Sequence, residues 1–381
     1  MKILFAFVFF SMVQIAFAQN YDALIGRAAE ALNQRNYCKA FDIFKTALVD
    51  STKVTPYDYY AAAISATNCN DDKQALLWLS KAQIKGLGLA KEDIPYIEKD
   101  SSLFKLHDYT EWLLFISKMK KSFSDQESKK LKKADEWLNT IYVNAIQPKG
   151  NRKFNKPNSG FALYFTKVDS LHVPYLVYVP KTYNRLAPTK TIVFLHGGVV
   201  SLDDFMHKDP EFANEPIFSI GEKFNAIVVY PFGKKDFGWV GQEKAFKNIY
   251  TVLDQVEQVY NVDLKNVYLG GMSNGGTAAF WFASQNINRF KGFFAISALP
   301  KLKIEEIRFK NLAQGKPFYS INAKDDDVYP YNKVLEIYNT TKSVAKDWHF
   351  QTIETGGHGF IYEPEKGIQI LDKFFGELLS R

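Results

Sequence analysis

The sequence predicts two domains of different class: an all-α helical repeat domain, followed by an α/β domain built on a doubly wound, mostly parallel sheet. Three observations lead to this prediction. The chain has 381 residues, more than one ordinary domain needs. Residues 21–86 repeat themselves, and from Phe161 onward short apolar strands alternate with helical stretches. The expected layout is a leader over residues 1–18, the repeat over 19–118, a linker over 119–160 and the α/β domain over 161–381.

The first residues have the pattern of a cleaved secretory signal peptide. Lys2 precedes an apolar run, and Ala16-Phe17-Ala18 provides small residues before a cleavage point. The run is too short for a bilayer span, and no cysteine follows it to carry a lipid anchor. We therefore expect a secreted or periplasmic protein after cleavage near Ala18, with no membrane span further along.

Composition excludes several classes of function. Apolar and aromatic residues make up 46% of the chain and charged residues 23%, which excludes wholesale disorder. The net charge of +7 is modest, and no basic block interleaved with aromatics dominates, so we expect no nucleic-acid partner. With 2 cysteines and no Cys/His cluster, we expect no metal site and no disulfide scaffold.

Small residues recur along the first region. Four residues have the same residue type 35 positions later in the chain. They are Ala28, Asn33, Ala40 and Ala47, which correspond to Ala63, Asn68, Ala75 and Ala82. Alanines seven apart lie on one helix face, where they let a neighbouring helix approach. A period near 34 with helical pairs resembles tetratricopeptide repeats. Such a domain implies a surface for a protein partner, and a purely structural spacer remains the alternative.

Cys38 and Cys69 fit this helical layout. They fall near the start of the second expected helix and the end of the third, which antiparallel packing brings together. Export permits oxidation, so we expect a disulfide, with two free buried thiols as the alternative.

The second region alternates strands with helices. The clearest helix is Lys244–Tyr260, whose apolar residues fall on one face. Active sites of such sheets lie at the carboxyl ends of the strands. The expected strands are Tyr175–Val179, Thr191–Leu195, Ala226–Tyr230, Val267–Leu269, Phe293–Ser297, Phe318–Asn322 and Phe350–Ile353.

The most informative motif is Gly271-Met272-Ser273-Asn274-Gly275. It follows the strand Val267–Leu269 and precedes the helix-like stretch Thr277–Gln285. A GxSxG motif between strand and helix is typical of a nucleophile elbow, whose tight turn exposes the serine hydroxyl. Ser273 is therefore the candidate nucleophile, and a plain glycine-rich turn is the alternative.

A second glycine-rich turn, His196-Gly197-Gly198, directly follows the strand Thr191–Leu195. Exposed backbone N–H groups there suit an oxyanion hole. We expect the hole to combine the N–H of Asn274 with that of Gly198 or Val199. We interpret His196 as a residue that orders the turn rather than as a base.

The candidate base is His358, in the loop Gly356-Gly357-His358-Gly359 after the last strand. A turn histidine without a role is the alternative. The other histidines lie in the repeat, before the serine or within a strand: His107, His172, His196, His207 and His349.

The candidate acid belongs to Asp325-Asp326-Asp327, which follows the strand Phe318–Asn322. Adjacent carboxylates repel one another, so we expect one to be buried against the imidazole and the others to face solvent. These residues alone leave the choice among the three open.

Further short segments of the second region resemble one known family of enzymes. Tyr230-Pro231-Phe232-Gly233, Gly238-Trp239 and Asn261-Val262-Asp263, together with the serine motif, resemble the polyhydroxybutyrate depolymerase and feruloyl esterase group of α/β-hydrolases. The resemblance covers the second domain and none of the first. It implies the α/β-hydrolase fold, the chain order serine, acid, histidine, and a serine esterase without metal or organic cofactor.

The same resemblance bears on the acid and on the pocket. Under the register of that group's acid loop the acid is Asp326, but Ala323 replaces a glycine and Tyr329 intervenes before Pro330, so Asp325 remains a rival. The resemblance also implies that Trp239 lines the substrate pocket, with a core aromatic as the alternative.

The expected function is a secreted serine hydrolase that cleaves carboxylic esters through Ser273, His358 and Asp326. Feruloylated or acetylated polysaccharide, a polyester and small aryl esters all fit these residues. Two alternatives stay open. One is a serine peptidase of the same fold, and the other is an interaction protein whose repeat binds a partner beside a non-catalytic hydrolase domain.

Overall fold

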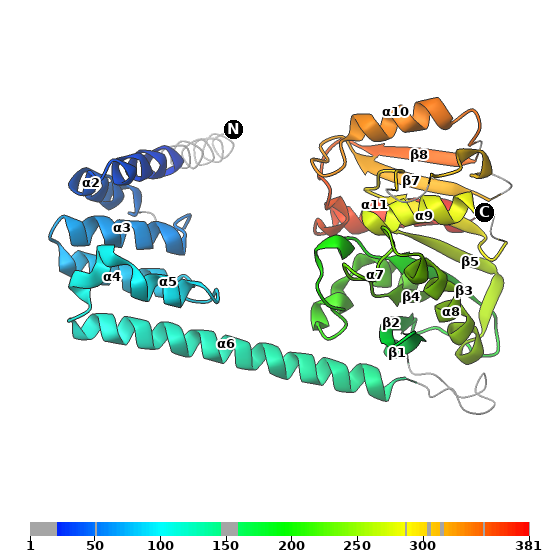
Figure 1. Cartoon of the computed structure of the whole chain (residues 1–381), viewed down its shortest axis with the longest axis horizontal. Helices are drawn as coiled ribbons and strands as arrows, with labels where there is room; N and C mark the ends of the chain where they lie inside the picture. Colours follow the sequence, from blue (N-terminus) through cyan, green and yellow to red (C-terminus); the bar gives the residue numbers. More distant parts are fainter. Residues whose placement is uncertain are drawn as a thin grey trace, which may run out of the picture. The chain divides into compact units, whose positions relative to one another are not determined.

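The computed structural model describes most of the chain as two compact units, Met1–Lys132 and Lys133–Arg381 (Figure 1). The expected signal peptide over residues 1–18 lies outside the described residues. Described are residues 21–49, 52–145, 159–285, 288–302, 306–312, 316–345 and 347–380.

Where the structure describes it, the first unit consists of helices joined by turns, as expected. Side chains cap three of its helices: Asn36 accepts from the N–H of Lys39, Thr55 forms a capping box with Asp58, and Asp71 accepts from Gln74. Its elements are a helical stretch over 21–33, α2 (Tyr37–Ala47), α3 (Pro56–Asn68), α4 (Asp72–Ile84), α5 (Asp93–Lys99), the 3₁₀ turn η1 (Ser101–Leu106) and the first part of α6 (Thr110–Val143).

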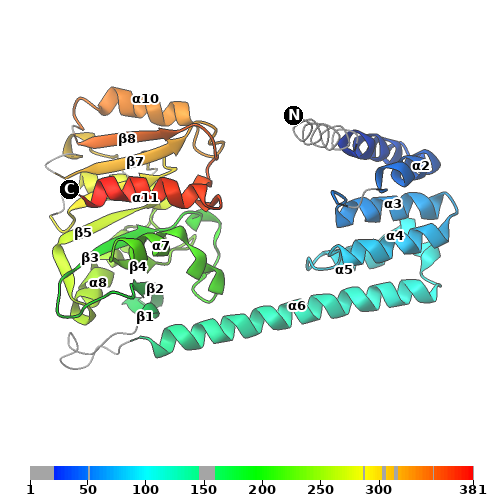
Figure 2. The same ribbon diagram turned by 180° about the vertical axis from the view of Figure 1, so that it is seen from behind.

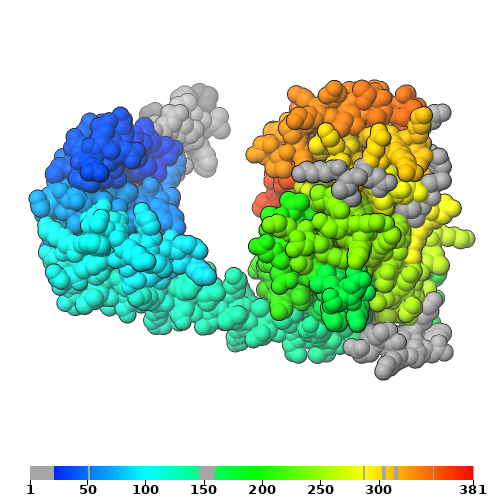
Figure 3. Space-filling view, in the orientation of Figure 1, coloured from blue at the N-terminus to red at the C-terminus, as the bar shows by residue number. Residues whose placement is uncertain are grey.

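The recurring alanines form the seams of this unit. Each of them is at most 5% exposed: Ala28, Ala40, Ala47, Ala63, Ala75 and Ala82. In the space-filling view the side chains close the space between neighbouring helices (Figure 3). Cys38, in the first turn of α2, and Cys69, at the end of α3, are joined by a disulfide.

Helix α6 runs further than the sequence indicated. The stretch 119–160, expected as a linker, is helical as far as Val143. The end of this helix packs within the second unit: Ile141 is fully buried, and the ring of Trp137 lies 5.2 Å from that of Phe161. The lysine-rich middle of α6 is a solvated helix, and the apolar residues beyond it extend the second unit.

The second unit is built on one eight-stranded sheet in the order β1-β2-β4-β3-β5-β6-β7-β8 (Figure 1). The pairs β1–β2 and β2–β4 are antiparallel, and the neighbours from β4 to β8 are parallel. The strands are β1 (Gly160–Val168), β2 (Leu171–Val179), β3 (Thr189–Leu195), β4 (Ile227–Pro231), β5 (Val262–Met272), β6 (Gly292–Ile296), β7 (Phe318–Ala323) and β8 (Trp348–Ile353). This confirms the predicted α/β class.

Helices cover both faces of the sheet, and the strands are apolar on both sides as a result. In β3, Val193 and Leu195 belong to one buried cluster, and the alternating Ile192 and Phe194 belong to the other. In the view from behind, α11 lies across the face of the sheet that carries Ile192 and Phe194 (Figure 2). The first cluster includes residues of α8 (Glu243–Val259) and α9 (Asn274–Ser284), and partly buried residues of α10 (Tyr331–Thr341) pack against it. The second cluster includes residues of α7 (Pro216–Lys223) and α11 (Lys366–Leu379).

All seven expected strands are present, and β1 is an eighth that the sequence did not predict. Among the described helices, none has both the length and the apolar character that crossing a bilayer requires.

Candidate active site

The sequence-predicted site residues follow four parallel strands at one edge of the sheet. Gly197 follows β3, Ser273 follows β5, Asp326 follows β7 and His358 follows β8. Because these strands are parallel, their carboxyl ends share one edge, where ligand sites of open α/β sheets form.

Ser273 occupies a strained turn between β5 and α9. Its φ of 54° and ψ of −117° are unusual for a residue with a side chain. Two backbone hydrogen bonds hold the turn: the N–H of Ser273 donates to the carbonyl of Ile296, and its own carbonyl accepts from Thr277. This is the geometry of a nucleophile elbow.

The flanking glycines are required by close backbone packing. A Cβ atom added to Gly271 would lie 2.1 Å from the carbonyl oxygen of Leu195, and one added to Gly275 would lie 1.8 Å from the same oxygen. The start of α9 therefore lies directly against the end of β3. That contact brings the serine beside the glycine turn that follows β3.

The backbone groups predicted to form the oxyanion hole lie close to Ser273 in the chain or in space. A Cβ added to Gly197 would lie 2.9 Å from the Cβ of Ser273. Asn274 is the first residue of α9, and Val199 is the first residue of the 3₁₀ turn η3 (Val199–Ser201), with Gly198 in a left-handed conformation before it. N–H groups at such first positions have no partner within their own helix.

The side chains of His196 and Trp239 form hydrogen bonds with the backbone around the turn His196-Gly197-Gly198. The Nε2 atom of His196 accepts from the N–H of Gly233 at 2.9 Å, and its Nδ1 contacts the carbonyl of Gly197 at 2.7 Å. The indole Nε1 of Trp239 donates to the carbonyl of His196 at 2.9 Å. Both imidazole nitrogens thus serve the backbone, which fits the interpretation of His196 as an ordering residue.

Trp239 is placed in the core rather than on a pocket wall. Its side chain is 1% exposed and lies edge-on to the ring of His196, with the ring centres 5.0 Å apart. Of the two roles left open by the sequence, the structure therefore favours the core aromatic. The physical reason is that the buried indole N–H is satisfied by the carbonyl of His196, which lies inside the fold.

His358 and Asp326 form a hydrogen-bonded pair. The Nδ1 atom of His358 lies 2.9 Å from Oδ2 of Asp326, whose side chain is fully buried while that of His358 is 19% exposed. The other carboxylate oxygen, Oδ1, accepts from the N–H groups of Val328 and Tyr329 at 2.9 and 2.8 Å. The carboxylate therefore contacts Nδ1 of the ring, and Nε2 is the nitrogen on the opposite side of the imidazole.

The neighbouring acids have different surroundings. Asp327 is exposed, and Asp325 is exposed with its carboxylate on the N–H groups of Gly356 and Gly357. Of the three candidates, Asp326 is the one whose carboxylate contacts the imidazole of His358.

Tyr329, for which the sequence predicts no role, contacts both Asn274 and His358. Its hydroxyl accepts from the side-chain amide of Asn274 at 3.1 Å, and its ring meets that of His358 edge-on at 5.4 Å. The signal available in the sequence was its position, one residue inserted before Pro330 in the acid loop.

Burial of His196 makes a measurable contribution to the pH dependence of stability. Desolvation lowers the pKa of this imidazole to about 4, below the value of about 6.5 that an exposed histidine has. The neutral ring therefore stabilises the fold fully above pH 6.5, and this contribution is lost as the pH falls towards 4. We expect a loss of about 3 kcal/mol in the free energy of unfolding from this group between those limits.

The measurement is urea unfolding at several pH values between 4 and 7 for the wild type and His196→Gln. The free energy of unfolding of His196→Gln should depend less on pH than that of the wild type. The control is His172→Gln, which removes an imidazole from an exposed position. Equal slopes in the wild type and His196→Gln would contradict the expectation.

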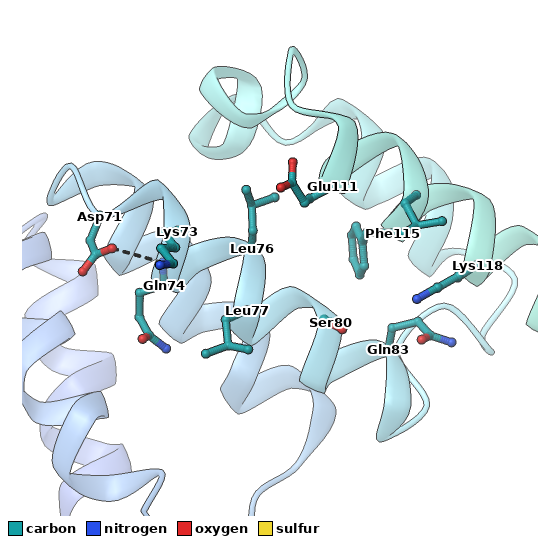
Figure 4. A pocket seen from close by; sticks show the side chains of 11 residues that line it. Asp71, Lys73, Gln74, Leu76, Leu77, Ser80, Gln83, Glu111, Phe115 and Lys118 are labelled. Atoms are coloured by element: carbon teal, nitrogen blue, oxygen red, sulfur yellow. Dashed lines mark hydrogen bonds between the residues drawn. The ribbon is translucent and has the colours of Figure 1, made fainter.

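Apart from the predicted site, the described residues form a cavity but no metal-binding cluster. Among the described residues, no group of three or more His, Cys, Asp or Glu side chains could hold a metal ion. A cavity of about 530 Å³ lies in the first unit between α4 and the start of α6, with Leu76, Leu77 and Phe115 on its walls (Figure 4). None of the predicted catalytic residues lines it.

The second unit therefore carries a strained serine turn and a hydrogen-bonded histidine–aspartate pair at the carboxyl ends of the parallel strands of an α/β sheet. No family model matches the chain. In sequence, 172 residues are 27% identical to a bifunctional acetylxylan esterase/xylanase of Neocallimastix patriciarum, and the match covers 42% of this chain. The chain spans 22% of the length of that relative.

Solved structures with a similar chain course include three hydrolases. A ferulic acid esterase has 18% identity and a TM-score of 0.46, with 58% of this chain and 99% of that chain covered. A fluorophosphonate-binding serine hydrolase of Staphylococcus aureus has 15% identity and a TM-score of 0.46, over 59% and 100%. An acylaminoacyl peptidase of Pyrococcus horikoshii has 16% identity and a TM-score of 0.46, over 58% and 42%.

Proposed function

We propose that this chain is a serine hydrolase that cleaves carboxylic esters through a covalent acyl-enzyme. The observation that supports it most is the 2.9 Å contact between Asp326 and His358 at the sheet edge that also carries the strained Ser273 turn. Nucleophile, base and orienting acid are the three parts that this chemistry needs.

In the first half of the proposed reaction, Oγ of Ser273 attacks the ester carbonyl carbon. Nε2 of His358 accepts the hydroxyl proton, and Asp326 keeps the proton of Nδ1 in place and stabilises the imidazolium. The carbonyl oxygen becomes an oxyanion, which the N–H groups of Asn274 and of Gly198 or Val199 stabilise. Loss of one such donor lowers the rate by about 10²–10³.

In the second half, the imidazolium returns a proton to the leaving alcohol as the tetrahedral intermediate collapses to the acyl-serine. Water then attacks the acyl group while His358 takes its proton, and the carboxylic acid leaves with Ser273 restored. No step needs a metal or an organic cofactor.

An ester of a polysaccharide is the substrate class that we favour. The sequence likeness to a protein named as an acetylxylan esterase/xylanase supports it. Feruloyl and acetyl groups on polysaccharide, a polyester and small aryl esters use the same chemistry, so the acyl and alcohol preferences distinguish them.

The remaining parts of the chain enter the same proposal. We propose that residues 1–18 are a signal peptide, so that the enzyme acts outside the cytoplasm. We also propose that 19–118 form a tetratricopeptide-like repeat, which binds a protein partner or serves as a spacer, and that 161–381 form the catalytic domain. The burial of the recurring alanines supports the repeat.

The test is a substrate panel with the purified protein. Acetylated xylan, methyl ferulate, p-nitrophenyl acetate and a peptide p-nitroanilide are offered to the wild type and to Ser273→Ala, and both are treated with a fluorophosphonate probe. We expect ester turnover and probe labelling at Ser273, with both falling to background in the variant.

The other results decide between the alternatives. Turnover of the anilide without the esters would favour a serine peptidase. No turnover and no labelling of a folded protein would favour an interaction protein. Because Ala accepts the same backbone conformation as Ser, the melting temperature of Ser273→Ala should match that of the wild type.

A further inference from the structure

The loop that carries His358 is held by a second carboxylate, that of Asp325. Its Oδ2 accepts from the N–H of Gly356 at 3.0 Å, and its Oδ1 accepts from the N–H of Gly357 at 2.9 Å. One side chain thus engages two successive backbone N–H groups. These are the two residues directly before the candidate base.

The conformation of the glycines makes this double contact possible. Gly356 has a φ of 131° and Gly357 a φ of 59°, both in regions that favour glycine. A Cβ added to Gly356 would lie 2.7 Å from Cβ of Phe360. Successive N–H groups in such a turn point to one side and form a concave site for an anion, which Asp325 fills.

The two hydrogen bonds to Asp325 also affect the pKa of its carboxyl group. The N–H groups of Gly356 and Gly357 hold the pKa of the Asp325 carboxyl below its ordinary value. The carboxylate therefore stays ionised at neutral pH, and its two bonds are of the stronger, charge-assisted kind.

Other anchors of the loop act further from the imidazole. Nζ of Lys366 donates to the carbonyl of Thr355 at 3.3 Å, and the hydroxyl of Tyr362 donates to Oε2 of Glu215 at 3.1 Å. Asp325, by contrast, binds the backbone N–H groups of the two residues directly before His358.

We propose that Asp325 is a positioning residue for the hydrolase reaction: it fixes the backbone before His358, while its neighbour Asp326 fixes the ring. The two adjacent acids then divide one task, because Asp326 holds the imidazole at Nδ1 while the backbone that carries the ring is held by Asp325. The inference rests on the proposed function, and a base displaced by about 1 Å costs about 10²-fold in rate.

The test compares Asp325→Ala and Asp325→Glu with Asp327→Asn as the matched control, since Asp327 is an exposed acid two positions away. With p-nitrophenyl acetate we expect Asp325→Ala to lower kcat by about 10–100-fold with KM within about twofold of the wild type. Asp325→Glu, which keeps the carboxylate, should recover part of kcat, and Asp327→Asn should match the wild type.

A second measurement needs no substrate. Hydrogen–deuterium exchange of the segment 355–360 reads the loop directly, and we expect it to be about tenfold faster in Asp325→Ala than in the wild type or Asp327→Asn. Unchanged exchange, or an unchanged kcat in the folded Ala variant of an active enzyme, would overturn the inference.

The two measurements separate this inference from the proposed function. If the wild type hydrolyses no ester and binds no probe, the proposed function fails and the reaction role of Asp325 fails with it, whatever the exchange shows. If the wild type is active, kcat and exchange in Asp325→Ala decide on Asp325 alone.

Discussion

Replacement of Asp326 by asparagine is expected to lower kcat for ester hydrolysis by about 10⁴-fold, with little change in KM. Two backbone donors determine how the new amide would lie. Oδ1 of residue 326 accepts from the N–H groups of Val328 and Tyr329, so the amide oxygen must take that side. The amide NH₂ group is then left facing Nδ1 of His358.

That orientation selects the wrong tautomer of the base. Facing a donor, Nδ1 of His358 must accept, so the ring proton moves to Nε2, the nitrogen that should take the proton of Ser273. The fold should be retained, because asparagine has nearly the same shape as aspartate. The effect therefore appears in catalysis and not in the melting temperature.

The measurement is steady-state kinetics on p-nitrophenyl acetate, with Asp327→Asn as the control that carries the same change at an exposed site. If Asp325→Asn lost about 10⁴-fold while Asp326→Asn stayed near the wild type, the acid would be Asp325 and the assignment would be wrong.

Substitution of Gly275 by alanine is expected to prevent folding of the second unit or to lower its free energy of unfolding by about 4 kcal/mol or more. The added Cβ would lie 1.8 Å from the carbonyl oxygen of Leu195 and 2.4 Å from the carbonyl carbon. Both atoms belong to the backbone of a central strand, which cannot move aside without breaking the pairing of β3 with β5.

The control is Gly359→Ala in the loop after His358. Its Cβ would meet nothing closer than 3.8 Å, so we expect stability within about 1 kcal/mol of the wild type. Urea unfolding is followed by tryptophan fluorescence, to which four residues of the second unit contribute (Trp137, Trp239, Trp281 and Trp348) and two of the first (Trp78 and Trp112). The first unit is unchanged in both variants, so a difference between their unfolding curves reports on the second unit. A Gly275→Ala protein as stable as the control would contradict the close contact between α9 and β3.

The strong periodic signals predicted the elements well. Strands buried on both faces, such as β3 and β6, contain a short unbroken apolar run, and their predicted bounds lie within two residues of the observed ones. Strand β1 was missed because its burial does not alternate and includes partly exposed aromatics, which gives no clear period. The end of α6 was expected as linker because its few apolar residues, Trp137 and Ile141, are buried only by contact with the sheet unit.

By itself the sequence determined the α/β class, the serine turn after β5, the glycine turn after β3 and the histidine loop after β8. These depend on local chain geometry, since a strand, a glycine turn and a helix are each specified by neighbouring residues. Only the tertiary structure shows that Asp326, and not Asp325, contacts the imidazole of His358, and that the side chain of Trp239 is buried. In each case the side chain's partner lies far away in the chain: His358 for Asp326, Gly356 and Gly357 for Asp325, and the carbonyl of His196 for Trp239. The direction in which a side chain turns is decided by the partner that satisfies its charge or its N–H group, and the fold alone brings that partner within reach.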